Sequence, residues 1–183
     1  NVNITVTNVV ENVPMLSISD VTLAEGTSVS GATAFNFVVT LSEPVNETVT
    51  VQVATADNGA TAASGDYTPV LPTTLTFGPG ETTKSVTVQV RQDDRVEGTE
   101  QFQVSLSAPT NATILDGAGF GTILDDDVRS VSIDDVTVTE GDSGTKTAVF
   151  TVTLSQSSPT IVSVVATTVA DTATPGSDYT TLS

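Results

Sequence analysis

Residues 35–41 read Phe-Asn-Phe-Val-Val-Thr-Leu, with a large apolar side chain at every second position from Phe35 to Leu41. Successive side chains of a β-strand point to opposite faces, so this alternation predicts a strand with one face in a core. The same period recurs at Val49, Val51 and Val53, at Val86, Val88 and Val90, and at Phe102, Val104 and Leu106. Because helical periodicity is absent from the sequence, we expect an all-β protein.

Turn signals separate these runs, notably Gly78-Pro79-Gly80 and Asp116-Gly117. The predicted strands cover residues 15–24, 33–42, 47–55, 67–77, 83–91, 100–107 and 118–125. Seven short strands without helices predict an antiparallel β-sandwich. In the first strand the apolar phase slips between Ile18 and Val21, which indicates either a β-bulge or a crossing between sheets.

The sequence contains a tandem repeat. Residues 16–26 recur as residues 131–141 with seven of eleven positions identical, residues 37–42 recur as 150–155, and residues 64–67 recur as 176–179. We therefore predict a complete module over 14–127 and the first half of a second copy over 128–183. Residues 1–13 are interpreted as the last strand and linker of a preceding, cadherin-like module.

Composition excludes several classes of function. The chain has 22 Asp and Glu against 5 Lys and Arg, a formal charge of −17. Nucleic acids and anionic membrane surfaces are therefore poor partners. No apolar run is long enough to cross a bilayer, so direct membrane insertion is not expected. The absence of Cys and His excludes disulfides, Cys or His zinc sites and nucleophile–His triads. We therefore do not expect the protein to be an enzyme.

Acidic residues gather at one predicted end of the sandwich. If successive strands run up and down, the loops after the first, third and fifth strands meet the exit from the seventh. These segments hold nine carboxylates: Glu25, Asp57, Asp93, Asp94, Glu97, Glu100, Asp125, Asp126 and Asp127. Arg95 is the only basic residue inside them. Carboxylates this close repel one another, and oxygen-rich sites suit Ca²⁺.

Alternatives exist for single residues and for the whole cluster. The acidic loops could be solvated segments that keep the protein soluble, without a metal. Asp66 and Asp178 fit an Asx-type turn better than a metal site, with Tyr67 and Tyr179 as packing residues. Asp94 could pair with Arg91 or Arg95.

The motifs together resemble the Calx-beta module. They are Glu25-Gly26, the Ser64–Tyr67 stretch, the Phe77–Glu81 turn, the acidic run 93–100 and Asp125-Asp126-Asp127. The resemblance implies a seven-stranded immunoglobulin-like sandwich that binds calcium in the loops at one end. It further implies the ligands Glu25, Asp57, Asp93, Glu97, Glu100, Asp125, Asp126 and Asp127, with Glu140 and Asp171 matching in the second copy. Gln92 departs from the aspartate common in this family, which implies a neutral ligand or none.

The expected function is that of a calcium-binding structural or adhesive repeat in a large extracellular or cell-surface protein, with Ca²⁺ as cofactor. Calcium would rigidify the loops and the junction between modules. Neighbouring repeats of the same chain are the expected partners, and a cell-surface or matrix ligand is a further candidate. Two alternatives remain open: a calcium-sensing regulatory domain of a membrane-protein system, and a calcium-independent spacer.

Overall fold

The computed structural model describes residues 13–182. The chain divides into two compact units, 1–128 and 129–183, and each is described by itself. The predicted strand and linker of residues 1–13 lie outside the described residues except for Val13. The strands of the first unit are β1 (Met15–Ile18), β2 (Val21–Ala24), β3 (Ala32–Leu41), β4 (Val49–Asn58), β5 (Thr73–Phe77), β6 (Thr83–Arg91), β7 (Glu100–Thr110), β8 (Thr113–Ile114) and β9 (Ala118–Leu124).

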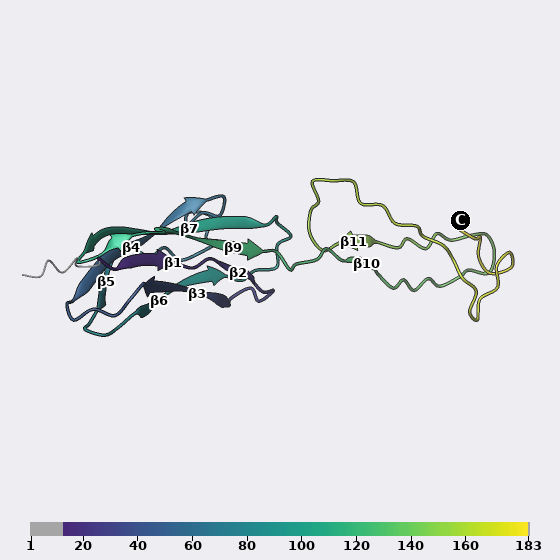
Figure 1. Cartoon of the computed structure of the whole chain (residues 1–183). Coiled ribbons are helices and arrows are strands. Elements are labelled where there is room, and N and C mark those ends of the chain that lie inside the picture. Colours follow the sequence, from purple (N-terminus) through teal and green to yellow (C-terminus); the bar gives the residue numbers. More distant parts are fainter. Residues whose placement is uncertain (1–12, 183) are drawn as a thin grey trace, which may run out of the picture. The chain divides into compact units, whose positions relative to one another are not determined.

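Two sheets pack face to face in the first unit (Figure 1). One has the order β6-β3-β1-β8 and the other β2-β9-β7-β4-β5. The alternating apolar residues of both sheets form one core, as the two-residue period predicts. At its centre the ring of Phe102 lies 5.7 Å from that of Phe35 and 5.8 Å from that of Phe37, measured between centroids. Removing a buried phenylalanine side chain from such a core costs about 3–5 kcal/mol.

The first predicted strand is divided between the two sheets, which resolves the slip in its apolar phase. β1 pairs with β3, whereas β2 pairs with β9 in the other sheet. The crossing lies at residues 19–20, where the Asp20 carboxylate accepts a hydrogen bond from the Phe120 N–H at 2.7 Å. A side chain at Gly119 would lie 2.6 Å from the Ser19 carbonyl oxygen, so glycine makes room for the crossing.

The predicted antiparallel arrangement holds for most described ladders but not for all. β2 runs parallel to β9, and β1 runs parallel to the short strand β8, which was not predicted. The predicted strand 67–77 is also too long, because β5 begins only at Thr73. Pro69 and Pro72 lack the N–H that a ladder requires, which accounts for the late start. The other predicted strands are found with small shifts at their ends; β4 and β7 extend further, to Asn58 and Thr110.

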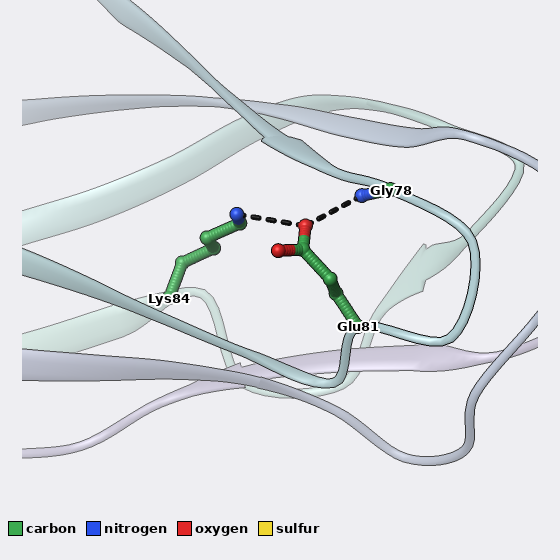
Figure 2. A network of polar contacts seen from close by, with 3 residues as sticks. All are labelled: Gly78, Glu81 and Lys84. Carbon is green, nitrogen blue, oxygen red and sulfur yellow. Dashed lines mark hydrogen bonds and ion pairs between the residues drawn. The ribbon is translucent and has the colours of Figure 1, made fainter.

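The turn between β5 and β6 lies at the end of the sandwich opposite the predicted acidic loops. Glu81 Oε2 accepts a hydrogen bond from the Gly78 N–H at 2.7 Å and forms an ion pair with Lys84 Nζ at 2.7 Å (Figure 2). Gly80 has φ of +81°, a conformation that favours glycine. The Glu81 carboxylate therefore closes this turn.

The second unit repeats a detail of the first. β10 (Val131–Ile133) and β11 (Val152–Leu154) pair antiparallel, with Val131 opposite Leu154. β1 and β3 pair in the equivalent register, with Leu16 opposite Leu41. The apolar side chains are covered differently, since Phe37 is 0% exposed and its repeat counterpart Phe150 is 52% exposed.

The described residues contain strands and turns but no helix. They therefore include no helix that is long and apolar enough to cross a membrane.

Candidate metal site

The candidate site is built at the ends of two neighbouring strands. Glu25 follows β2, and its N–H donates to the Leu124 carbonyl at 3.1 Å, which continues the β2–β9 ladder by one bond. The Gly26 N–H then donates to Asp126 Oδ1 at 2.9 Å. Asp125 Oδ2 accepts a hydrogen bond from the Glu97 N–H at 2.7 Å. The loop after β2, the loop after β6 and the exit from β9 are thus fastened together.

Three carboxylates meet at this point. One carboxylate oxygen from each of Glu25, Asp125 and Asp127 lies within 4.8 Å of the others. Glu25 is 5% exposed, which is rare for an acidic side chain. Asp127 Oδ2 is buried and has no hydrogen-bond partner among the described residues. A buried polar oxygen without a partner is unfavourable, so this arrangement is poised for an additional group.

The carboxyl groups of this cluster also disfavour one another's ionisation. Burial, followed by the charges of Asp93, Glu97, Asp125 and Asp127, raises the pKa of Glu25 to about 7. Burial and neighbouring carboxylates also raise the pKa of Glu97 and of Asp127 above their ordinary values. Because each carboxylate disfavours ionisation of the next, the cluster requires either protons or a cation.

Asp66 belongs to this end of the sandwich, although the sequence indicated only a turn. The turn is present, since Asp66 Oδ2 accepts hydrogen bonds from the Thr61 N–H and Ser64 Oγ, both at 2.7 Å. However, burial and then the charges of Asp66 and Glu97 raise the pKa of Glu100. Asp66 also raises the pKa of Glu97. The repeated Ser64–Tyr67 motif was the available signal for this residue.

Asp57 accepts hydrogen bonds from the protein itself. Its Oδ1 accepts a hydrogen bond from Tyr67 Oη at 2.6 Å and another from the Ala62 N–H at 3.0 Å, and these bonds lower the pKa of Asp57. These bonds engage only one of its two carboxylate oxygens, so the predicted role of Asp57 as a metal ligand stays a prediction. Tyr67 is 3% exposed and stacks on Phe102 with ring centroids 4.6 Å apart, as its predicted packing role requires.

Gln92 faces the loop after β2. Its Nε2 donates to Thr33 Oγ1 at 3.0 Å, and Thr33 Oγ1 donates to the Glu25 carbonyl. A Cβ at Gly31 would lie 2.0 Å from Gln92 Oε1, so glycine leaves the space that the amide fills. The neutral residue therefore supports the main chain at Glu25.

The remaining predicted ligands lie around the cluster. Asp93 Oδ1 accepts a hydrogen bond from the Arg95 N–H at 2.9 Å, and the Asp126 carboxylate is exposed and binds Gly26. In the second unit, Glu140 and Asp171 are both exposed.

The counterpart of Tyr67 in the second unit lacks the same support. Tyr179 Oη is buried without a hydrogen-bond partner among the described residues. Asp171, the second-copy match of Asp57, lies eight positions before Tyr179 instead of ten, and its side chain is exposed.

A hard cation fits this donor set. Calcium binds six to eight oxygens at about 2.3–2.6 Å, so two oxygens on one ion are at most about 5 Å apart. The oxygens of Glu25, Asp125 and Asp127 satisfy that limit. The site offers carboxylate oxygens, which favour Ca²⁺ over softer transition metals.

The fold and this end of the sandwich define an immunoglobulin-like β-sandwich with an acidic loop cluster. The family model for the Calx-beta domain matches residues 17–127 and again residues 125–183. The chain belongs to the Calx-beta family.

Solved structures with the same fold carry related names. The apo form of the Calx CBD1 domain matches with a TM-score of 0.52 and 22% identity, covering 63% of this chain and 100% of that one. The calcium binding domain CBD12 of CALX1.1 matches with a TM-score of 0.54 and 23% identity, over 69% of this chain and 53% of that one. CBD12 from CALX1.2 matches with a TM-score of 0.54 and 23% identity, over 62% of this chain and 44% of that one.

Proposed function

We propose that the chain is a calcium-binding, non-catalytic repeat module that serves a structural or adhesive role in a large extracellular or cell-surface protein. The observation that carries the proposal is the buried Glu25 carboxylate beside Asp125 and Asp127, with one oxygen of Asp127 lacking a partner among the described residues.

Glu25, Asp125 and Asp127 would form the centre of the site, and Asp93 and Glu97 contribute further negative charge to it. Asp66 and Glu100 form an adjacent carboxylate pair that could extend it. Bound calcium supplies positive charge that replaces the protons these carboxylates otherwise retain. The chain's own hydrogen bonds, from Gly26 to Asp126 and from Glu97 to Asp125, already hold the loops close to the geometry required.

The proposed consequence is mechanical stiffness at one end of the first unit. Residues 125–127 lead directly to Arg129, where the second unit begins. An ion held by these residues would restrict the backbone just before the next module. Neighbouring repeats are therefore the proposed partners, together with a cell-surface or matrix ligand.

Calorimetric titration of the 183-residue chain with calcium, together with thermal melts in calcium and in chelator, tests the proposal. Binding only to the folded state adds RT ln(1 + [L]/Kd) to stability, so calcium should raise Tm. A Kd near 10⁻⁴–10⁻³ M is typical of extracellular modules, whereas micromolar binding would favour the calcium sensor. No heat and superimposable melts would leave the acidic spacer as the function.

A further inference from the structure

The parallel β2–β9 ladder joins the second strand of the first unit to its last strand. Val21 pairs with Gly121, and Ala24 pairs with Leu124. The chain enters this unit before β1 and leaves it after Leu124. Tension along the chain therefore pulls β2 from its Val21 end and β9 from its Leu124 end, which are opposite ends of the same ladder.

Forces at opposite ends of a ladder act in shear. All hydrogen bonds between β2 and β9 then carry the load together, whereas forces at the same end of an antiparallel pair break the bonds one after another. β1 precedes β2 in the force path and pairs in register with β3 in the other sheet. Detachment of β1 would leave the β2–β9 ladder loaded in the same direction.

The acidic cluster lies where this ladder ends. Glu25 directly follows β2, and Asp125 and Asp127 follow β9, with their carboxylate oxygens within 4.8 Å of one another. A cation bound there would join the two loaded strands by metal–oxygen bonds in parallel with the backbone hydrogen bonds. In its absence, the Glu25–Leu124 and Gly26–Asp126 hydrogen bonds hold the same end.

We propose that the β2–β9 ladder is the load-bearing element of the first unit, and that a divalent cation held by Glu25, Asp125 and Asp127 clips its end. The cation part rests on the proposed calcium-binding function, whereas the shear geometry does not. The inferred activity is resistance to pulling force, set by the calcium concentration.

Single-molecule pulling on the full chain tests both parts. Because the chain has no cysteine, the pair V13C and V128C gives unique handles that load β2 and β9 in shear. Both positions are exposed, at 51% and 82%. The control pair is E47C and P79C, which flank the paired ends Val49 and Phe77 of antiparallel β4 and β5 and therefore peel that ladder.

In chelator, we expect the V13C/V128C chain to unfold at clearly higher force than the E47C/P79C chain. Equal or lower force would overturn the load-bearing assignment. At constant force, calcium should slow unfolding of the V13C/V128C chain by at least about tenfold, since forced unfolding follows the unfolding rate. Glu25→Gln should abolish this slowing, and Glu47→Gln, on an exposed loop at the other end, should retain it.

Calorimetry separates failure of the proposal from failure of the proposed function. Calcium that binds but leaves the unfolding rate unchanged would refute the clip. If calcium does not bind at all, the proposed function and the clip both fail, and the comparison of the two handle pairs in chelator still decides whether the ladder bears the load.

Discussion

Glu25→Gln should stabilise the calcium-free protein while weakening its response to calcium. The substitution keeps the size of the side chain and removes its charge. Glu25 is 5% exposed, and its pKa in the folded protein is about 7, because burial and four neighbouring carboxylates oppose ionisation. In the unfolded chain the ordinary value is 4.5.

The sign follows from proton binding. Between pH 4.5 and about 7 the folded state retains a proton that the unfolded state has lost, so the free energy of unfolding falls as the pH rises. This pKa difference corresponds to at most about 3 kcal/mol, fully lost above pH 7. Glutamine does not titrate. In chelator at pH 8 the variant should therefore be more stable than the wild type by up to about 3 kcal/mol, or about 10 °C in Tm.

Differential scanning calorimetry in chelator at pH 5 and pH 8 measures this directly. At pH 5 the difference should shrink to less than about 1 kcal/mol, because that pH lies only half a unit above the ordinary value of 4.5 and Glu25 is still protonated in the folded protein. In calcium the order should reverse, since the variant has lost a ligand; each tenfold loss of affinity removes about 1.4 kcal/mol. Glu47→Gln should match the wild type throughout. A Glu25→Gln protein that melts at or below the wild type in chelator at pH 8 would refute the reasoning.

Four further substitutions test separate parts of the structure. Asp66→Asn should weaken calcium binding as measured by calorimetry, whereas Asp57→Asn should lower Tm equally with and without calcium; the opposite pattern would identify Asp57 and not Asp66 as a ligand. Tyr67→Phe should lower the free energy of unfolding in urea by about 1.5–3 kcal/mol, because it removes a hydrogen bond to a charged group, and unchanged stability would contradict that role. Gly121→Ala places a Cβ 2.3 Å from Phe102 Cζ and should cost about 1–3 kcal/mol by the same assay, unless the ring can move freely.

Much of the fold could be predicted because its signals are local. The alternation around Phe35 and Phe37 defines β3 and its buried face, and the slip between Ile18 and Val21 marks the crossing between sheets. Pro69 and Pro72 were equally local signals against a long fourth strand. The parallel pairing of β2 with β9 is different, because it depends on which sheet the chain enters after the crossing.

The candidate site shows the limit of reasoning from loops alone. Asp57 and Asp66 lie in the same connection, and nothing in their spacing tells which carboxylate is occupied by Tyr67 Oη. The orientation of the Gln92 amide likewise depends on the space that Gly31 leaves for it by lacking a Cβ. That contact follows from the packing of the folded chain and is not visible from the residue types alone. The sequence predicted which segments meet, and the three-dimensional contacts distribute the roles among their residues.

The repeated register of β10 and β11 shows what aligns the opening strands of each unit. In the first unit β3 pairs along its other edge with β6, from Ala32 opposite Arg91 to Thr40 opposite Thr83. In the second unit β11 pairs with β10 in the register that β3 has with β1. Residues 130 and 155 exchange the same flanking hydrogen bonds as residues 15 and 42. In both units a serine side chain, that of Ser42 or Ser155, thus closes the ladder of the opening strands and fixes their alignment.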